Sequence, residues 1–298
     1  KNIVLGLGNF DGVHIGHQKL INGLVAMAKE LNGTPAVFTF HPHPLAVLKP
    51  DSCPPQLLSQ GCKQKIFARL GVEVLLTVPF NLKLASLAPE DFVRMVLNEE
   101  IGARGVVVGY NYTFGHRGRG TPELLKGLSE IYGYALQVVQ PVMVDGYTVS
   151  STLIRHLIKK GDVSEAAKFL GYYPFAEGEV VAGNKRGSTL LGFPTANLEI
   201  EPDLLVPANG VYSAKICYNG DTYLGLANIG VKPTFNDIKR NIEVHLLDFC
   251  QDLYGKQIKV SFTRRIRGEK KFATPSELIK QIEMDISDAR TEWSKARE

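Results

Sequence analysis

The sequence predicts an α/β chain in which an N-terminal doubly wound parallel sheet is followed by a small antiparallel β-barrel with a C-terminal helix. Three observations support this fold class. The chain has 298 residues, which is large for one core and comfortable for two domains. Strand-like and helix-like segments alternate five times up to Gly171. From Glu177 onward the hydrophobic pattern changes to short runs with the two-residue period of strands.

The composition is typical of a soluble globular protein, with 44% hydrophobic and 21% charged residues and a formal net charge of +4. This mild basic excess suits phosphate-bearing small molecules and does not require nucleic acid. The four cysteines form no Cys-x-x-Cys pair and no zinc spacing, so we expect reduced thiols in a cytoplasmic protein. No apolar run approaches the ~20 residues that span a membrane, and no signal peptide is visible, so we expect no membrane partner.

The first half of the chain is organised around residues 8–17, Gly-Asn-Phe-Asp-Gly-Val-His-Ile-Gly-His. An apolar run at residues 3–5 predicts a buried parallel strand before this stretch. The apolar spacing after it predicts an amphipathic helix, through Leu20, Ile21, Leu24, Val25, Ala28 and Leu31. A junction of this kind favours anions, because unpaired backbone N–H groups and the positive end of the helix dipole meet there.

His14 and His17 are three residues apart, so both side chains can face one pocket around the first helical turn. Two imidazoles there can donate hydrogen bonds to the phosphate oxygens of a nucleotide. The alternative is a tight turn with two surface histidines. The glycine order matches neither a kinase P-loop nor the dinucleotide-binding Gly-x-Gly-x-x-Gly pattern.

The second predicted strand, residues 36–40, runs into His41-Pro42-His43-Pro44. Alternating prolines are expected to stop any helix and to hold an extended, stiff segment at the carboxyl edge of the sheet, where ligands gather. His41 and His43 therefore either border the same pocket or are surface histidines in a rigid turn.

Two later segments of the first half carry further candidate residues. Residues 109–120 follow a strand and hold four glycines, three aromatic rings and two arginines, a poor core segment that suits a loop around a flat aromatic ligand and its phosphate. The alternative is a disordered basic loop. Ser150, Ser151 and Thr152 open a helix with Arg155 one turn in, and hydroxyls at this position are ordinarily just helix caps.

In the second half, Asn219-Gly220 predicts a tight hairpin, and Thr274-Pro275-Ser276-Glu277 predicts the cap of a closing helix. The most informative segment is residues 183–197, which end in Gly-Phe-Pro-Thr-Ala-Asn. Thr195 and Asn197 project neutral oxygens two residues apart, and Mg²⁺ accepts such oxygens together with water and phosphate. A plain turn is the alternative.

Residues 241–246 alternate strictly between polar and apolar side chains. The pattern places Ile242, Val244 and Leu246 in the core and Glu243 on the other face, where an acid is usually only solvated. A basic run follows at Arg264, Arg265, Arg267, Lys270 and Lys271. Only Phe272 accompanies it, so we do not expect a nucleic-acid site.

The string His14-Ile15-Gly16-His17 resembles the signature of the nucleotidyltransferase superfamily, and residues 8–17 resemble its form in bacterial bifunctional riboflavin kinase/FMN adenylyltransferases. The resemblance implies a Rossmann-like nucleotidyltransferase fold, with His14, His17 and Arg155 as catalytic residues. It further implies ATP contacts and flavin contacts in this half. The ATP contacts are Gly8, Asn9, Phe10, Gly16, Ser150, Ser151 and Thr152, and the flavin contacts are His41, Pro42, Asn111 and Phe114.

The second half resembles riboflavin kinase through Gly192-Phe193-Pro194-Thr195-Ala196-Asn197. The resemblance implies that Thr195 and Asn197 hold magnesium and that Glu243 is the catalytic base. It also implies ATP contacts at Gly187, Gly192, Pro194 and Asn197. The family often has arginine where this chain has Ser188, so a phosphate contact is not expected from that position.

Together these resemblances imply a bifunctional enzyme with domains at residues 1–172 and 173–298. The second domain would phosphorylate riboflavin to FMN, and the first would adenylylate FMN to FAD with release of pyrophosphate. ATP would be the co-substrate of both steps, with Mg²⁺ as a cofactor. The string His14-Ile15-Gly16-His17 also spells the class I aminoacyl-tRNA synthetase signature, but the second signature of that class, Lys-Met-Ser-Lys-Ser, is missing. A flavin-binding regulatory module without activity is the non-enzyme alternative. A homo-oligomer is compatible with the sequence, which does not determine the oligomeric state.

Overall fold

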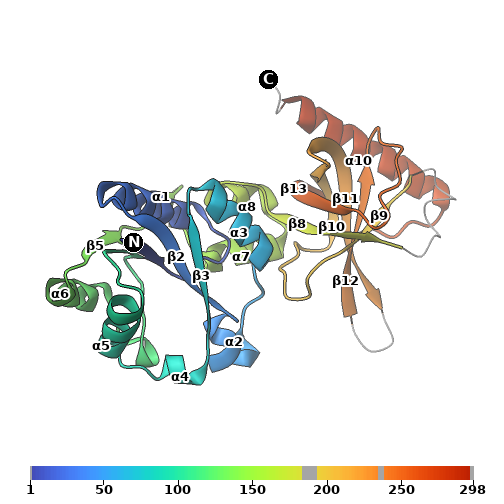
Figure 1. Ribbon diagram of the computed structural model, residues 1–298. Helices are drawn as coiled ribbons and strands as arrows, with labels where there is room; N and C mark the ends of the chain where they lie inside the picture. The colour runs from blue at the N-terminus through green and yellow to red at the C-terminus, as the bar shows by residue number, and fades with distance from the viewer. Residues whose placement is uncertain (1, 183–192, 234–237, 296–298) are drawn as a thin grey trace. The chain divides into compact units, whose positions relative to one another are not determined.

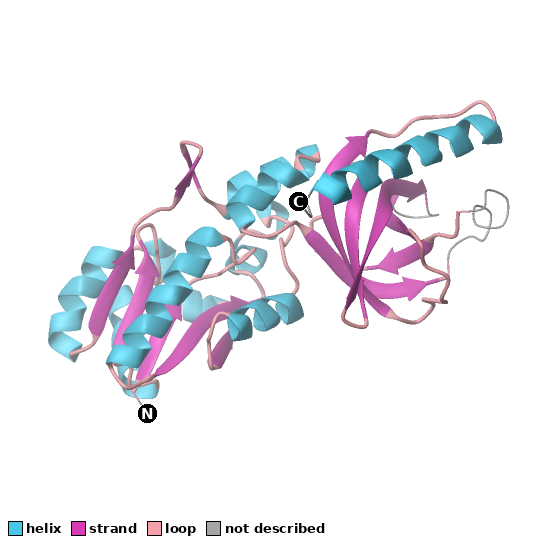
Figure 2. Ribbon diagram, turned by 90° about the horizontal axis from the view of Figure 1, so that it is seen from above, coloured by secondary structure: helices cyan, strands magenta, loops and turns pink. Residues whose placement is uncertain are grey.

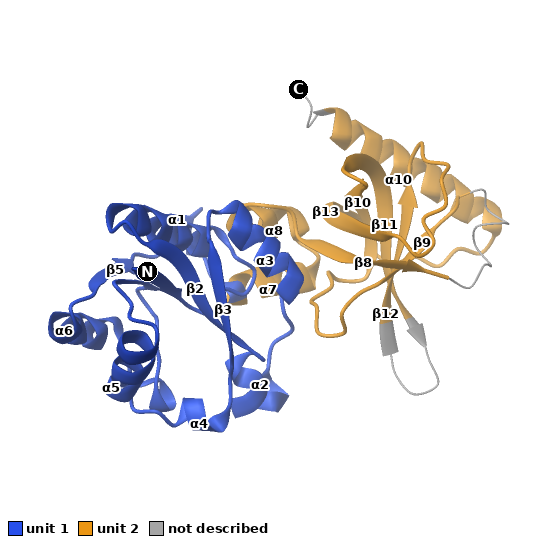
Figure 3. Ribbon diagram, viewed as in Figure 1, with its two compact units in different colours: residues 1–151 blue, residues 152–298 orange. Residues whose placement is uncertain are grey.

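The computed structural model describes residues 2–182, 193–233 and 238–295. The chain divides into two compact units, Lys1–Ser151 and Thr152–Glu298 (Figure 3). Each unit has its own hydrophobic core. The functional domain boundary that we predict at residues 172 and 173 lies further along the chain and stays a prediction.

The first unit contains the predicted parallel sheet of five strands (Figure 1). In spatial order they are β3 (Val74–Pro79), β2 (Thr34–His41), β1 (Ile3–Leu7), β4 (Gly105–Gly109) and β5 (Ala135–Val139). Val4 and Leu5 in the central strand are fully buried, as expected for a parallel strand covered on both faces. The strand order reverses direction between β1 and β4, so the carboxyl end of β1 lies at the topological switch point, where open α/β sheets bind ligands.

Helices cover both faces of this sheet. Helix α1 (Ile15–Glu30) packs against β1 and β4 through the predicted apolar stripe, with Leu20, Ile21, Leu24 and Ala28 buried. The core on the opposite face includes Leu97 and Leu125, which come from η2 (Phe92–Glu100) and α6 (Pro122–Tyr132). The remaining elements of this unit are α2 (Pro44–Leu48), η1 (Pro50–Ser52), α3 (Gln60–Arg69), α4 (Leu82–Ala85), α5 (Pro89–Asp91), η3 (His116–Gly118), β6 (Met143–Val144) and β7 (Tyr147–Thr148).

One local expectation for this unit is wrong. The prolines after β2 do not exclude a helix, because α2 begins at Pro44, where a missing N–H and a fixed φ fit the first helical turn. His43 caps this helix by accepting the Leu45 N–H at 3.1 Å through Nδ1. A further helix begins at Pro89 as α5 and passes directly into the π-helical η2.

The second unit is built on a closed, six-stranded antiparallel barrel, which confirms the predicted fold (Figures 1 and 2). Around the barrel the strands are β10 (Gly210–Tyr218), β11 (Asp221–Pro233), β12 (Ile238–Leu246), β9 (Ala196–Glu199), β8 (Phe175–Val181) and β13 (Gln257–Arg267). The hairpin between β10 and β11 turns at Asn219 and Gly220, with φ of 49° and 89°, as the Asn-Gly pair predicts.

Among the described residues, helices α10 (Pro275–Lys295) and α8 (Val163–Leu170) pack against strands of the barrel. The long helix α10 lies along the barrel and buries Ala289 against Val211 and Leu226 (Figure 2). Helices α7 (Ser151–Lys160) and α8 precede the barrel in the chain. Val163 of α8 is fully buried and belongs to the barrel core. The compact unit therefore begins earlier than the barrel strands themselves.

Candidate active sites

The turn after β1 has an unusual backbone. Phe10, Gly12 and Val13 adopt positive φ values of 50°, 81° and 32°. A β-branched residue rarely adopts this conformation, and Val13 is fully buried, so the surrounding packing must hold the strain. The Val13 N–H closes the turn by donating to the Phe10 carbonyl at 3.2 Å. The strained turn fixes the start of α1 at the carboxyl edge of the sheet.

His14 and His17 come together at the N-terminus of α1, as their spacing predicts. His14 is the N-cap residue, and its Nδ1 accepts the His17 backbone N–H at 3.2 Å. This bond leaves Nε2 of a neutral His14 as the protonated nitrogen, which can donate to a ligand. A Cβ at Gly16 would lie 3.2 Å from the His14 ring, so glycine gives this ring its room.

The two imidazole rings are stacked, with centroids 3.6 Å apart and planes inclined by 13°. The pKa of His17 is lowered well below its ordinary value, first by burial and then by the nearby His14 and Lys63. His17 is therefore neutral at neutral pH. Its Nδ1 is buried and makes no hydrogen bond among the described residues. The pair thus offers hydrogen-bond donors and acceptors beside a helix N-terminus.

Asp11 and Lys63 form a buried charged layer next to the histidines, which the sequence reasoning missed. Each of the two residues is 5% exposed. The Asp11 Oδ1 accepts the Leu57 N–H at 3.0 Å, and its backbone carbonyl accepts the Ser151 hydroxyl at 2.9 Å. Burial lowers the pKa of Lys63, and Asp11 partly opposes this shift. The only sequence signal was a lysine between Cys62 and Phe67 on the buried face of α3.

The other N-terminal ATP candidates differ in their placement. The Phe10 ring is buried and packs edge-on against Phe67 and His17, with centroids 5.6 and 5.3 Å apart, so it anchors the turn. Asn9 is exposed, and Gly8 is partly exposed. Ser151 ties the start of α7 to the histidine turn through Asp11. Gly16 in the histidine turn is partly exposed. At the start of α7, Ser150 and Arg155 are partly exposed and Thr152 is exposed.

The flavin candidates of the first unit lie in two segments. His41 and Pro42 are exposed at the end of β2, where Gln60 Nε2 lies 2.9 Å from His41 Nδ1. Asn111 is exposed in the loop after β4. The expectation that this loop is a poor core segment is wrong for Phe114, which is 7% exposed and packs in the core, stacked on Tyr112 at 5.7 Å. A flavin contact from Phe114 stays a prediction.

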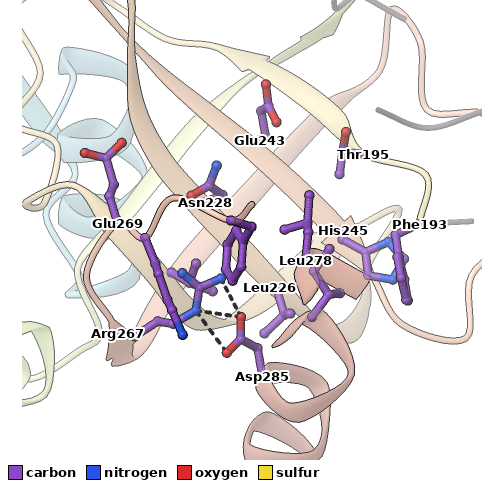
Figure 4. Close-up of a pocket in the computed structure, with 14 residues that line it drawn as sticks. Phe193, Thr195, Leu226, Asn228, Glu243, His245, Arg267, Glu269, Leu278 and Asp285 are labelled. Atoms are coloured by element: carbon purple, nitrogen blue, oxygen red, sulfur yellow. Dashed lines mark hydrogen bonds and ion pairs between the residues drawn. The ribbon is translucent and has the colours of Figure 1, made fainter. Parts of the chain in front are cut away.

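The barrel unit contains a pocket of about 390 Å³ (Figure 4). Its apolar lining comes from barrel strands, from α10 and from the segments that hold Phe193 and Phe272, and acidic and basic side chains line it as well. Glu243 and Thr195 lie together on one side of the pocket, and His245 lies beside Phe193 (Figure 4). The apolar lining consists of Phe193, Val211, Leu226, Phe272, Leu278 and Ile282. A pocket of this size and lining suits a flat, drug-sized ring system.

The strand β12 presents its predicted polar face to the segment 193–197. Ile242, Val244 and Leu246 are buried in the barrel, whereas the intervening side chains are partly exposed. The His245 Nδ1 lies 2.7 Å from the Pro194 carbonyl oxygen, and its ring meets Phe193 edge-on at 5.6 Å. Glu243 is directly opposite Asn197 in the pairing of β12 with β9. The structure thus brings together the predicted base and the predicted metal ligands.

The oxygen donors of this segment fit a magnesium ion that arrives with a nucleotide. Thr195 offers an exposed hydroxyl and Asn197 an amide oxygen, both hard ligands. Among the described residues there is no group of three or more His, Cys, Asp or Glu side chains that could hold a metal ion. Gly187, Ser188 and Gly192 lie outside the described residues.

The three arginines of the basic run lie on β13 and form ion pairs or hydrogen bonds within the barrel unit. The Arg267 guanidinium forms an ion pair with Asp285 at 2.9 Å, and this aspartate on α10 is only 2% exposed. Arg264 pairs with Glu292 at 2.9 Å, also on α10. Arg265 donates to the Asn209 carbonyl at 2.6 Å. These arginines hold the helix and a loop against the barrel.

The fold and the two sites define the class of the protein as a two-domain, nucleotide-dependent transferase. Residues 1–153 match the family model of FAD synthetase, and residues 170–293 match that of riboflavin kinase. No helix in the described part of the chain is long and apolar enough to cross a membrane.

Similar proteins cover nearly the whole chain. The bifunctional riboflavin kinase/FMN adenylyltransferase of Bacillus subtilis is 40% identical over 99% of this chain and 93% of its own length. The protein of the same description from Escherichia coli K12 is 36% identical over 97% and 92% of the two chains. The chain belongs to the bifunctional riboflavin kinase/FMN adenylyltransferase family.

A crystal structure from Streptococcus pneumoniae, described as a macrolide-efflux protein, has the same fold. Its TM-score is 0.89 at 34% identity, and the match covers 97% of this chain and 94% of that one. The efflux description differs from the names of the sequence relatives, and the two family models agree with the relatives. The neighbour therefore supports the fold, while the family membership rests on the models and relatives.

Proposed function

We propose that this chain converts riboflavin to FMN in its barrel domain and FMN to FAD in its N-terminal domain, with ATP as the second substrate of both reactions. One observation carries the proposal. A single chain holds both a stacked histidine pair at a helix N-terminus and an apolar pocket that Glu243 and Thr195 line.

In the N-terminal domain, a phosphate oxygen of FMN attacks the α-phosphorus of ATP. A new P–O bond forms, the bond between the α-phosphorus and its bridging oxygen breaks, and pyrophosphate leaves. Negative charge builds on the phosphates during this step. We infer that the N-terminus of α1 and the Nε2–H of His14 offset this charge, and the cap geometry of His14 and the neutral His17 beside it support the inference. Arg155 and the hydroxyls of Ser150, Ser151 and Thr152 are proposed to hold the triphosphate.

In the barrel domain, the isoalloxazine ring of riboflavin is proposed to enter the 390 Å³ pocket. Its apolar lining matches the ring, and the acidic and basic side chains that also line it can bond the polar edge of the ring and the ribityl chain. Glu243 then takes the proton of the 5′-hydroxyl as this oxygen bonds the γ-phosphorus of ATP and ADP leaves. Mg²⁺ held by Thr195, Asn197 and the phosphates would neutralise charge on the transferred group.

A direct test is to incubate the protein with riboflavin, ATP and Mg²⁺ and to separate the flavins by chromatography. We expect FMN to form first and FAD to follow, and we expect FAD from supplied FMN and ATP. Flavin binding without ATP consumption would instead identify a binding module. Retention on tRNA with a strong salt dependence would favour the synthetase alternative. We further propose that the enzyme acts in the cytoplasm, on small molecules alone.

A further inference from the structure

Asn241 occupies a special position between the two parts of the barrel site. Its Nδ2 donates to the Glu243 Oε1 at 2.9 Å and to the Asn197 Oδ1 at 3.2 Å. A primary amide nitrogen carries two hydrogens, so both bonds can form at once. One side chain on β12 therefore contacts both the predicted base and a predicted magnesium ligand.

These two bonds fix orientations that the backbone leaves open. Glu243 has three side-chain torsions, and a carboxylate in a pocket lining would otherwise populate several rotamers. The bond from Asn241 is charge-assisted, which makes it stronger than a bond between neutral groups. Asn197 is only 8% exposed, and accepting from Asn241 decides which end of its amide is the oxygen. A carbonyl oxygen has two lone pairs, so accepting the bond from Asn241 does not by itself exclude a cation.

We propose that Asn241 is a positioning residue for phosphoryl transfer, which holds the Glu243 carboxylate and the Asn197 amide oxygen in one arrangement. The inference rests on the proposed kinase function. Asn241 touches neither the riboflavin hydroxyl nor the phosphate in this account, and its amide does not act as a base. Its effect must therefore pass through Glu243 and Asn197 and appear in the rate of the chemical step rather than in flavin binding.

His245 on the same face of β12 has a different task. It contacts the Pro194 carbonyl and the Phe193 ring, and so anchors the segment 193–197 further from Glu243. Two residues on this face of β12 thus support the site in different ways. One residue anchors the backbone of the segment, and the other aligns the functional side chains.

The test compares Asn241→Leu, which keeps the approximate size but removes both donors, with Asn241→Gln, which keeps the amide. We expect Asn241→Leu to lower kcat for FMN formation about 10- to 100-fold, as small misplacements of reacting groups do. The KM for riboflavin and its Kd, measured by the fluorescence of the bound flavin without ATP, should change less than about threefold. Asn241→Gln should recover a large part of kcat. The riboflavin Kd of each variant also reports that its barrel is folded, whereas adenylylation of supplied FMN reports only on the other unit, which has its own core.

A double-mutant cycle with Glu243→Gln separates positioning from a merely structural role. If Asn241 acts through Glu243, Asn241→Leu should slow the Glu243→Gln enzyme far less than it slows the parent. Independent, multiplying effects would overturn the proposal. So would a raised riboflavin Kd with an unchanged kcat. A parent enzyme that makes no FMN would refute the proposed function itself, whereas an active parent with an equally active Asn241→Leu variant would refute this inference alone. If the leucine variant does not fold, Asn241→Ser takes its place, because its hydroxyl is too short to bridge both partners.

Discussion

The His14 and His17 imidazoles are stacked at a centroid distance of 3.6 Å, with the His14 Nδ1 accepting the His17 backbone N–H. Two imidazolium cations so close together, with Lys63 nearby, would repel each other. The neutral state of His17 is thus built into the turn. A neutral ring can still donate or accept a hydrogen bond, so this arrangement preserves hydrogen bonding toward phosphate without adding a fixed charge.

The first prediction concerns the histidine pair. His17→Ala should lower the rate of FAD formation about a hundred- to thousandfold, which is the usual cost of losing one preorganised donor to a charged transition state. His14→Ala should act similarly and should also weaken the start of α1, because it removes the N-cap. Formation of FMN by the same preparation is the control. An equal loss of both activities would indicate misfolding, and an unchanged rate of FAD formation would remove the histidines from the mechanism.

The second prediction is the pH dependence of stability. Folding lowers the pKa of His17, so below the ordinary histidine range, near pH 6.5, the unfolded chain binds a proton that the folded chain does not. Above that pH His17 is neutral in both states and has no effect on the free energy of unfolding. As the pH falls below it, protonation stabilises the unfolded chain, so the free energy of unfolding decreases. Its slope is at most about 1.4 kcal/mol per pH unit. Denaturant titrations between pH 7 and 5 should show it, and His17→Gln should flatten the slope. Identical slopes in both proteins would contradict the prediction.

The third prediction addresses the buried layer beneath the histidines. Lys63→Met leaves the Asp11 carboxylate buried without the lysine charge, and we expect the free energy of unfolding of the N-terminal unit to fall by about 3–5 kcal/mol. Lys65→Met on the exposed side of the same helix is the matched control, with an expected change within about 0.5 kcal/mol. Adding Asp11→Asn to Lys63→Met should restore part of the loss. Urea unfolding measures all three variants.

The sequence predicted the fold well where the pattern reflects local physics. Apolar runs such as the one in β1 indicate parallel strands, the Asn219-Gly220 pair specifies its hairpin, and the alternation along β12 sorts core from surface. The spacing of His14 and His17 also predicts that both rings lie at the start of one helix, and the two imidazoles are stacked there.

The sequence did not predict features that depend on distant partners. Asp11 and Lys63 are 52 residues apart in the sequence numbering, and a buried lysine runs against its ordinary preference for the surface. The burial of Phe114 was not predicted either, because its neighbours are glycines and arginines, and tertiary packing places its ring in the core. Asn241 is an ordinary polar residue of an exposed strand face until the strand pairing brings Asn197 next to it.

The fourth prediction concerns separable activities. A fragment of residues 152–298 should fold and make FMN but no FAD, because it retains the Val163 side chain in the barrel core and the bond from Arg265 to the Lys160 carbonyl at 3.3 Å. A fragment that begins at Tyr173 lacks both contacts. It should also make FMN, but with a lower melting temperature, since burying a valine contributes about 1.5–3 kcal/mol. A folded 152–298 fragment without kinase activity would show that the two sites depend on each other.

The fifth prediction assigns the kinase base. Glu243 lines the barrel pocket near Thr195, and Glu243→Gln keeps its shape and hydrogen bonding while removing its basicity (Figure 4). A primary alcohol is a weak nucleophile, so loss of the base should lower kcat for FMN formation by roughly 10² to 10⁴. The effect should lie near the lower end if the transition state is loose and the proton leaves late. Riboflavin binding should change little, and FAD formation from supplied FMN should continue. Glu179→Gln, an exposed acid on β8 outside the pocket, is the matched control and should keep the parent rate. If Glu243→Gln phosphorylates riboflavin as fast as the parent under conditions where chemistry limits the rate, Glu243 is only a solvated acid in the pocket lining.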